Sequence, residues 1–168
     1  RDRGTGDDVQ LVLESESLET PEMSIEELDL SAVHLSPGGR LVLAGSQSIT
    51  MEVKGRSFQV SAGSFFQVNT VMAEKMVDYL LENLDLSPEM NVLELYCGAG
   101  LFAAFLAPRV GRLIGVESSP YAAEDFVANL DEFDNVELYE ATAELALPHL
   151  YVQPDLIVMD PPRAGVDK

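Results

Sequence analysis

The stretch NVLELYCGAGLF, residues 91–102, combines a carboxylate with two glycines in a pattern suited to ligand binding. An apolar run contains Glu94 and leads directly into Gly98 and Gly100. Glycine permits a tight turn and lets a ligand come close to the backbone, and open α/β sheets bind their ligands beyond the carboxyl ends of the strands. We therefore predict a ligand-binding turn between a strand and a helix.

Two further acids follow strand-like segments downstream of that turn. Glu117 ends the segment RLIGVE, and its carboxylate could accept hydrogen bonds from both hydroxyl groups of an adenosine ribose. Asp160 stands before two prolines in VMDPPRAG, which stiffen the loop and remove backbone donors. Since the carboxyl ends of parallel strands share one edge of a sheet, we expect both acids near the glycine turn. The alternatives are a merely exposed acid at Glu117 and a simple turn at the prolines.

Glu94 separates two classes of ligand. Residues 98–103, GAGLFA, also fit the dinucleotide pattern Gly-x-Gly-x-x-Ala. A pyrophosphate at the start of the helix would be repelled by Glu94, whereas S-adenosyl-L-methionine brings a sulfonium and an ammonium group. We therefore expect Glu94 to orient hydrogen-bond donors or a positive charge. Alternatively, Glu94 is a buried carboxylate that only holds backbone amides of the loop, and the two roles can coexist.

Alternating strands and helices beyond residue 69 predict an α/β fold, the start of a doubly wound, Rossmann-like parallel sheet. Asn69 or Thr70 can cap a first helix with Glu74 in its first turn. Helical spacing indicates that Met72 and Met76 on this helix fill the core. The predicted strands are 91–96, 112–117, 136–140 and 155–160, and the predicted helices between them are 101–107, 120–130 and 142–147.

Residues 1–66 predict a small β-rich region instead. Short apolar stretches are separated there by Gly, Ser and Pro, and the alternation between residues 48 and 63 predicts an antiparallel hairpin with one buried face. Residues 24–28 could form a short helix. We place a domain boundary after residue 66, so that residues 67–168 form the α/β part. The predicted strands are 9–15, 40–45, 48–55 and 56–63.

The last predicted strand, residues 155–160, is continuously apolar, which is typical of a strand covered on both faces. As the fourth strand of a sheet that usually has five to seven, it would be left at an edge. We therefore expect the chain to be a fragment of a longer protein. Alternatively another chain or an unusual packing covers this edge, and pairing with a second copy of the chain would make a homo-oligomer.

The composition limits the partners and the cellular location that we expect for the protein. The formal net charge is −19, which on average repels polyanions, so that either the surface is simply acidic or any nucleic-acid contacts lie on other parts of the protein. No apolar run is long enough to span a membrane. The single cysteine, Cys97, excludes an intramolecular disulfide, and no Cys/His cluster suggests a metal. We expect a cytoplasmic protein with neither a membrane nor a metal partner.

With these residues in view, the chain resembles the S-adenosylmethionine-dependent RNA uracil-C5 methyltransferases, which make 5-methyluridine in ribosomal or transfer RNA. The resemblance covers roughly residues 48–168. It combines a Phe-x-Gln-x-Asn motif before the domain with an Asp-Pro-Pro-Arg-x-Gly motif after the fourth strand. The shared motifs are SAGSFFQVNT (61–70), LELYCGAGLF (93–102), IGVE (114–117) and DPPRAG (160–165).

The resemblance implies that residues 67–168 are the N-terminal half of a class I methyltransferase domain, preceded by the β-rich central region at 1–66. It also implies a set of cofactor contacts. Gln67 would reach the methionine end, Tyr96 would pack along the cofactor, Glu117 would bind the ribose, Thr142 would approach the adenine, and Asp160 would lie close to the methionine group and the target base. Leu101 departs from the family, which often has Asn or Thr there.

The resemblance also implies what is missing. In the family, a cysteine thiolate adds to C6 of uracil, C5 then attacks the methyl group, and a base removes the C5 proton. That nucleophile and that base are expected beyond Lys168, and Cys97 in the glycine turn is a small packing residue. We therefore assign no catalytic residue to this chain, and expect it to bind cofactor weakly and not to methylate RNA alone. RNA would be the partner of the full-length protein.

Three other functions remain open at this stage. An Asp-Pro-Pro loop also serves methyltransferases that modify a nitrogen of a nucleic-acid base, and these need no cysteine. The glycine pattern admits a nicotinamide-dependent oxidoreductase. The fold could also have been kept as a non-catalytic binding or assembly module.

Overall fold

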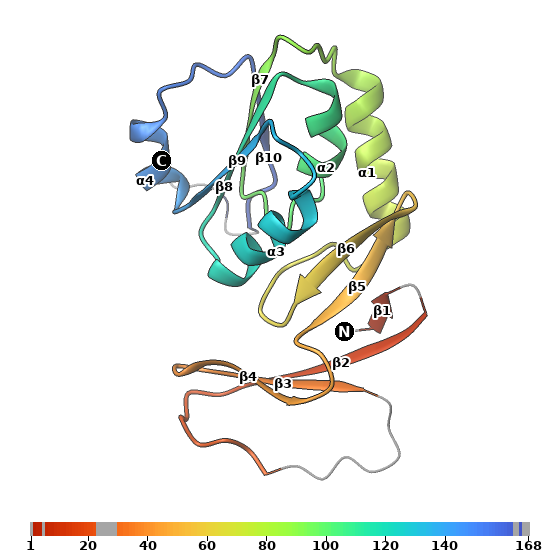
Figure 1. The fold of residues 1–168 in the computed structure, drawn as a ribbon, viewed down its shortest axis with the longest axis vertical. Helices are drawn as coiled ribbons and strands as arrows, with labels where there is room; N and C mark the ends of the chain where they lie inside the picture. Colours follow the sequence, from red (N-terminus) through yellow and green to blue (C-terminus); the bar gives the residue numbers. More distant parts are fainter. Residues whose placement is uncertain (1, 5, 23–29, 163–164, 166–168) are drawn as a thin grey trace.

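The computed structural model describes residues 2–4, 6–22, 30–162 and 165. Figure 1 shows an α/β unit at one end of the molecule and a β-sheet at the other, with a two-stranded hairpin between them. The short helix predicted at residues 24–28 lies outside the described residues. Within the described part, no helix is both long and apolar enough to cross a bilayer.

The N-terminal sheet has four strands in the order β1-β2-β3-β4. Strands β2 and β3 run parallel, and the other two neighbouring pairs are antiparallel. Strand β3 was not predicted, because its three central residues, Ala32, Val33 and His34, are all buried, so its sequence lacks the usual alternation. The bounds are Asp2–Gly4 for β1, Gly6–Glu14 for β2, Ser31–Ser36 for β3 and Gly39–Ala44 for β4.

The predicted antiparallel hairpin is confirmed as β5, Ser48–Val53, and β6, Arg56–Ser61. Lys54 and Gly55 form its turn with φ angles of 52° and 73°, as a two-residue type I′ turn requires. Its buried apolar side chains belong to the same core cluster as those of the α/β unit. The core thus crosses residue 66, and the domain boundary placed there stays a prediction.

Helix α1, Thr70–Asn83, begins as predicted, because the side chain of Asn69 accepts a hydrogen bond from the N–H of Met72 at 3.0 Å. The prediction for Glu74 is wrong: no acid lies in the first turn. Instead, Oε1 of Glu74 accepts a hydrogen bond from the N–H of Lys54 at 2.9 Å. Glu74 therefore holds the turn of the hairpin against α1.

The second half forms a four-stranded, fully parallel sheet in the order β10-β7-β8-β9, which confirms the predicted α/β class. Its two longer predicted helices differ in outcome. Helix α3 has the predicted bounds, whereas α2 is shorter than expected, because Leu101 and Phe102 lie in the turn and a 3-10 turn containing Pro108 follows. The helix expected at 142–147 is likewise a short α4 followed by a 3-10 turn. The bounds are Asn91–Leu95 for β7, Ala103–Leu106 for α2, Ala107–Arg109 for η1, Arg112–Glu117 for β8, Pro120–Leu130 for α3, Val136–Glu140 for β9, Ala143–Ala146 for α4, Leu147–His149 for η2 and Leu156–Met159 for β10.

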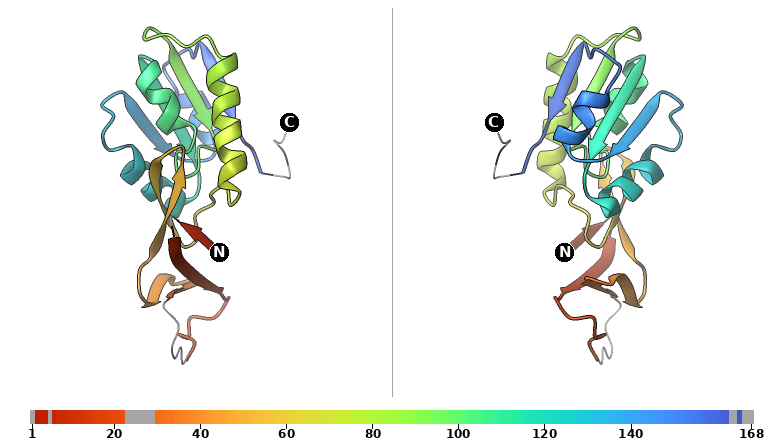
Figure 2. Two further views of the ribbon diagram at one scale, coloured as in Figure 1. Left: turned by 90° about the vertical axis from the view of Figure 1, so that its right-hand side faces the viewer. Right: turned by 90° about the vertical axis from the view of Figure 1, so that its left-hand side faces the viewer.

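The strand order reverses between β7 and β10, because β8 and β9 follow on one side of β7 and β10 lies on the other. Such a reversal is where open α/β sheets bind ligands, beyond the carboxyl ends of the strands. The arrowheads in Figure 2 show that these ends point toward the N-terminal β region. Strand β10 is at an edge, as predicted, and Ile157 and Met159 on it are 50% and 54% exposed. Pairing of this edge with a second copy stays a prediction.

Candidate functional site

The glycine turn follows the carboxyl end of β7, and every second residue in it has a left-handed backbone conformation. The φ angles are 60° at Tyr96, 56° at Gly98 and 88° at Gly100. Glycine adopts such angles without strain, whereas tyrosine does not, so Tyr96 holds a conformation that its surroundings must impose. Its side chain packs against the apolar cluster on the α4 side of the sheet.

The two glycines of the turn serve different purposes. A Cβ added to Gly100 would lie 2.3 Å from Cδ1 of Leu130, so Gly100 lets α3 pack against the turn. Among the described residues, a Cβ added to Gly98 would meet only the backbone oxygen of Phe65, at 3.8 Å. Gly98 therefore faces open space that is bounded by the segment of residues 65–67. Phe65 in this segment is 64% exposed and is a further candidate for the site that the sequence patterns did not predict.

Glu117 lies at the end of β8, as predicted, and its carboxylate holds the turn. Its Oε2 accepts a hydrogen bond from the N–H of Gly98 at 2.9 Å, and its Oε1 accepts from the N–H groups of Ser118 and Ser119 at 2.8 and 2.7 Å. A carboxylate has about four acceptor positions. Three are thus used for backbone amides, and one position on Oε2 is left for a ligand donor.

Glu94 is buried in β7 with only 2% of its surface exposed. The backbone N–H of Ala103 hydrogen-bonds to its carboxyl group, while its Oε2 has no hydrogen-bond partner in the part of the chain that the structure describes. Burial raises the pKa of Glu94, the Ala103 bond partly offsets this rise, and the nearby charge of Asp160 adds a smaller rise, so that the pKa is about 8. The carboxyl group is therefore mainly protonated at neutral pH, and its free oxygen is an unused polar atom beside the glycine turn.

Asp160 and Gln67 are brought together across 93 residues of sequence. Nε2 of Gln67, in the segment before α1, donates a hydrogen bond to Oδ2 of Asp160, after β10, at 3.0 Å. Strand register places Val158 opposite Glu94, so this pair lies on the β10 side of the strand-order reversal. Arg163 of the same loop is outside the described residues.

Thr142 lies on the opposite side of the turn from that pair, two residues after β9. Its side chain is exposed and hydrogen-bonds to the carboxylate of Glu144. The pKa of Glu144 is lowered mainly by a hydrogen bond from its own backbone N–H and to a smaller extent by the bond from Thr142. The N–H of Ala141 donates to the backbone oxygen of Glu117 at 2.9 Å. Thr142 is therefore connected to the turn through the backbone at the ends of β8 and β9.

Cys97 packs inside the turn. Its thiol is buried, and burial, followed by the charges of Glu94 and Glu117, raises its pKa well above the ordinary value. A Cβ added to Gly115 would lie 2.9 Å from its sulfur. A thiol that stays protonated in a closely packed position is a poor nucleophile.

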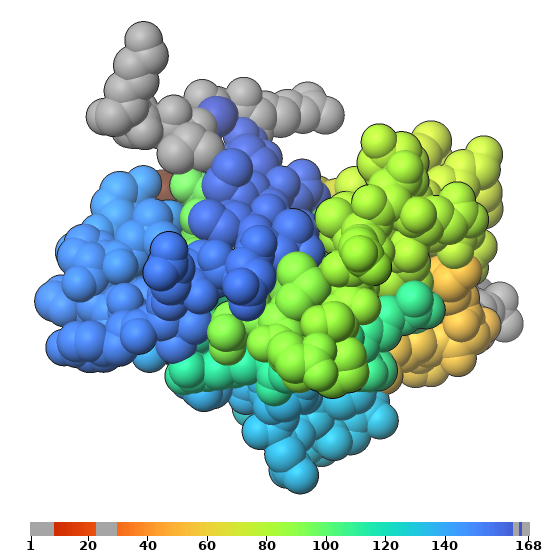
Figure 3. All heavy atoms as spheres, turned by 90° about the horizontal axis from the view of Figure 1, so that it is seen from above, coloured from red at the N-terminus to blue at the C-terminus, as the bar shows by residue number. Residues whose placement is uncertain are grey.

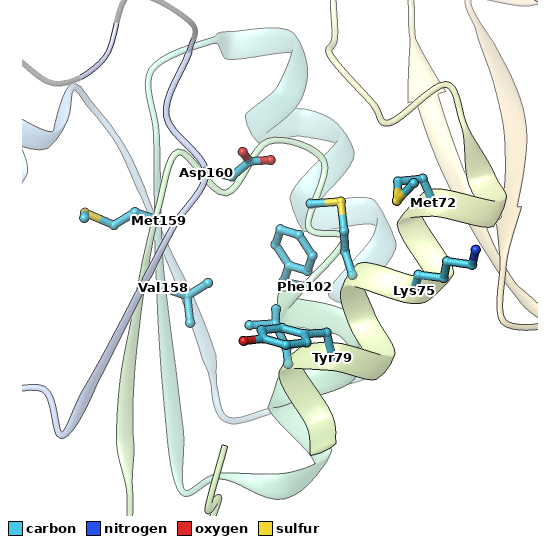
Figure 4. Close-up of a pocket in the computed structure, with 9 residues that line it drawn as sticks. Met72, Lys75, Tyr79, Phe102, Val158, Met159 and Asp160 are labelled. Atoms are coloured by element: carbon cyan, nitrogen blue, oxygen red, sulfur yellow. The ribbon is translucent and has the colours of Figure 1, made fainter. Parts of the chain in front are cut away.

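A groove of about 300 Å³ runs between α1 and β10, with Asp160 among its lining residues. Figure 3 shows the surfaces of α1 and of the segment containing β10 side by side, and Figure 4 shows Tyr79 and Phe102 in the groove between them. The prediction that Met72 fills the core is wrong, because its side chain lines this groove and is 50% exposed. Helical spacing identifies the apolar side of α1 but not what packs against it.

Known proteins match the chain over most of its length. A family model described as tRNA (uracil-5-)-methyltransferase matches residues 12–148. A relative from Streptomyces avermitilis, named an uncharacterized RNA methyltransferase, is 36% identical over 150 residues, which are 87% of this chain and 33% of that protein. YljE of Lactococcus lactis, also named an uncharacterized RNA methyltransferase, is 35% identical over 133 residues, which are 76% of this chain and 29% of that protein. The chain thus spans about a third of the length of these relatives.

The fold matches solved methyltransferases. The tRNA (uracil-54, C5)-methyltransferase of Pyrococcus abyssi, solved in complex with S-adenosyl-L-homocysteine, superposes with a TM-score of 0.70 at 20% identity, over 99% of this chain and 43% of that one. Trm5b of the same organism gives a TM-score of 0.54 at 15% identity, over 79% of this chain and 42% of that one. At these sequence identities the two solved structures show only that the fold is shared. Membership of the family rests on the sequence matches to the family model and to the relatives. The chain belongs to the tRNA (uracil-5-)-methyltransferase family.

Proposed function

We propose that this chain binds S-adenosylmethionine at the carboxyl ends of β7, β8 and β10, as the cofactor-binding part of an enzyme that methylates C5 of uracil in RNA. The observation that supports this most directly is the open side of Gly98. There the turn has no side chain, Glu117 holds the Gly98 N–H, and the space is bordered by the carbonyl of Phe65.

The residues present fit such a cofactor. Among the described residues, Oε2 of Glu94 is a buried oxygen next to the turn that has no hydrogen-bond partner. The carboxyl group is mainly protonated in the free chain, and a cationic ligand beside it would favour loss of that proton. Glu117 keeps one acceptor position for a ribose hydroxyl. Gln67 and Asp160 would bind the methionine end. Tyr96, Gly98 and Gly100 would shape the wall along the cofactor, and Thr142 would approach the adenine.

The cofactor would supply an electrophilic methyl group, and uracil C5 becomes nucleophilic only after a thiolate adds to C6. Cys97, the single cysteine of the chain, cannot act in this way because it is buried and its pKa is raised. We therefore propose that these 168 residues bind cofactor but do not themselves methylate RNA. Residues 67–168 would be the N-terminal half of the class I methyltransferase domain, and residues 1–66 the central region.

Ribosomal or transfer RNA is the proposed substrate of the whole enzyme, and the description of the family names transfer RNA. The net charge of −19 opposes contact between this chain and a polyanion. Four of the basic side chains in the described residues, Arg40, Lys54, Arg56 and Arg112, are already in ion pairs. We therefore assign the main RNA contacts to other parts of the enzyme.

Isothermal titration of the chain with S-adenosylhomocysteine and, separately, with NAD tests the proposal. We expect S-adenosylhomocysteine to bind with a Kd on the order of micromolar, a common range for such ligands, and NAD not to bind. The matched variants are Glu117→Gln, which should weaken binding, and Glu140→Gln, an exposed acid opposite Glu117 at the end of β9, which should not. Binding of NAD without any response to S-adenosylhomocysteine would replace the proposal with an oxidoreductase.

Labelled S-adenosylmethionine and unmodified RNA test the second part. We expect no 5-methyluridine from the chain alone. Label at a base nitrogen would contradict the uracil-C5 assignment, and label at uracil C5 would contradict our statement that Cys97 cannot serve as the nucleophile.

A further inference from the structure

The outer edge of β6 is covered by side chains of α3 rather than by another strand. In the hairpin, β6 pairs with β5 on one side only. On its other side, the backbone groups of Gln59 and the N–H of Ser61 meet Asp125 and Asn129, which are four residues apart and therefore on one face of the helix. The free edge of the hairpin is thus satisfied by two helical side chains.

Asp125 is fully buried, and its carboxylate binds the hairpin. Its Oδ2 accepts a hydrogen bond from the N–H of Ser61 at 2.7 Å, and its Oδ1 accepts from the hydroxyl of Ser61 at 2.6 Å and from Nε2 of Gln59 at 3.2 Å. A buried carboxylate needs such donors to offset the loss of water. Asp125 therefore fixes the hairpin to α3, and in the described residues its hydrogen bonds do not reach the glycine turn.

Asn129 contacts both the hairpin and the glycine turn. Its Oδ1 accepts from the N–H of Gln59 at 2.7 Å, and its Nδ2 donates to the backbone oxygens of Gln59 at 3.0 Å and of Ala99 at 2.9 Å. Both donors of the side-chain amide are thereby used. Ala99 is the residue between Gly98 and Gly100, so one buried side chain joins β6, α3 and the turn.

The contact to Ala99 fixes one side of the peptide plane between Ala99 and Gly100, whose other side is held by the backbone of the turn itself. The carbonyl of Ala99 and the N–H of Gly100 belong to one rigid peptide unit. Asn129 holds its oxygen, and the backbone oxygen of Cys97 accepts its N–H at 3.0 Å. Since glycine imposes little restriction on φ and ψ, these two bonds determine how the turn presents its backbone beside Gly98.

We propose that Asn129 is a positioning residue for the cofactor turn, which it orients against the β5–β6 hairpin through the carbonyl of Ala99. The inference rests on the proposed function for the identity of the ligand. It assigns to the hairpin a role in ligand binding, although no hairpin side chain belongs to the proposed cofactor contacts.

Asn135 offers a matched control within the same chain. Its Nδ2 also donates to two backbone oxygens, those of Ala107 and Val110, both at 2.9 Å. Asn135 precedes β9 and therefore lies at the amino end of the sheet, away from the turn. Removal of either side-chain amide loses two hydrogen bonds to carbonyls, and removal of Asn129 also loses the one donated by the N–H of Gln59. Of the two residues, Asn129 is the one that contacts the turn.

The experiment compares Asn129→Ala, Asn135→Ala and Asp125→Asn in the whole chain. The affinity for S-adenosylhomocysteine is measured well below the unfolding transition of each variant, together with hydrogen exchange of the Gly100 amide. We expect Asn129→Ala to weaken binding about tenfold and to speed Gly100 exchange about tenfold, as the loss of more than one hydrogen bond implies. Asn135→Ala and Asp125→Asn should lower the unfolding midpoint but leave both readouts within about twofold.

Equal losses in all three variants would overturn the proposal, since general destabilisation would then explain them, and so would an unchanged Asn129→Ala. If Asn129→Ala does not fold, Asn129→Ser, whose hydroxyl can bind water in the vacated space, is compared in the same way. If the unsubstituted chain does not bind S-adenosylhomocysteine, the proposed function fails. The exchange of Gly100 still decides the positioning role, because it needs no ligand.

Discussion

The side-chain amide of Gln67 donates to the carboxylate of Asp160 at 3.0 Å, and so joins the segment before α1 to the loop after β10. Both residues were predicted to bind the same end of one ligand, and the hydrogen bond places them together at the edge of the strand-order reversal. The pair is exposed, so it adds little to stability and is available to a ligand.

Replacing Gln67 with Ala should weaken S-adenosylhomocysteine binding about fivefold to tenfold, the usual effect of losing one or two hydrogen bonds. The unfolding midpoint should change little. Isothermal titration and thermal unfolding measure the two effects. The control is Asn83→Ala, because Asn83 is also an exposed amide with one hydrogen bond, to the backbone of Tyr79. Equal affinities in both variants would remove Gln67 from the site.

Replacing Glu117 with Gln should lower the free energy of unfolding by about 2 kcal/mol and abolish most ligand binding. A glutamine has one acceptor oxygen, and its NH₂ group cannot accept one of the bonds that Gly98, Ser118 and Ser119 now donate. Chemical denaturation and titration check both effects. Glu140→Gln on the neighbouring strand should change neither quantity, and a similar loss there would point to general charge effects.

The two glycines of the turn should respond differently to alanine. Gly100→Ala should cost about 3 kcal/mol or more of unfolding free energy, because its methyl group would meet Leu130 at 2.3 Å in addition to the strain of a positive φ. Gly98→Ala should cost only about 1 to 2 kcal/mol, since strain alone applies.

Ligand binding should show the opposite order. At a temperature at which both variants are folded, Gly98→Ala should lose more affinity for S-adenosylhomocysteine, because its methyl group occupies the open space beside Phe65. A folded Gly98→Ala variant that binds as tightly as the unsubstituted chain would show that the ligand does not approach Gly98.

The stability difference between the unsubstituted chain and Glu94→Gln should depend on pH. Burial raises the pKa of Glu94 from 4.5 to about 8 in the folded protein. Between these values the folded state keeps a proton that the unfolded state releases, so the stability of the unsubstituted chain falls as the pH rises and levels off above about 8. Relative to Glu94→Gln, the total loss approaches about 5 kcal/mol.

Urea denaturation of both proteins between pH 5 and pH 9 measures this difference. Glu82→Gln, which replaces an exposed acid on α1, is the control and should give a flat difference. A flat difference for Glu94→Gln as well would mean that the carboxyl group of Glu94 is hydrated or paired in solution.

Much of the site was visible in the sequence because it is encoded locally. Gly98 and Gly100 follow an apolar strand, and Glu117 ends the next one. In a parallel sheet the carboxyl ends of the strands all lie at the same edge. The alternation of strands and helices along the sequence was therefore enough to predict that these residues lie close together. The cap of α1 at Asn69 was predictable for the same reason, because it depends on residues three positions apart.

Sequence patterns predicted less where packing between distant segments decides the outcome. The exposure of Met72 depends on what lies beside α1, and the hydrogen bond that the N–H of Lys54 donates to Glu74 depends on where the hairpin turn lies. The roles of Asp125 and Asn129 were not predicted, because their partners in β6 are 64 to 70 residues away.

The amino-acid sequence by itself determined the parallel α/β class, the glycine turn and the acids at the strand ends, because backbone conformation and hydrophobic period are local properties. The tertiary structure alone decided that Glu94 retains its proton, that Gly98 is open while Gly100 is packed, and that Asn129 joins the hairpin to the turn. These properties arise from desolvation and from contacts between segments far apart in the chain, and neither is encoded in the spacing of neighbouring residues.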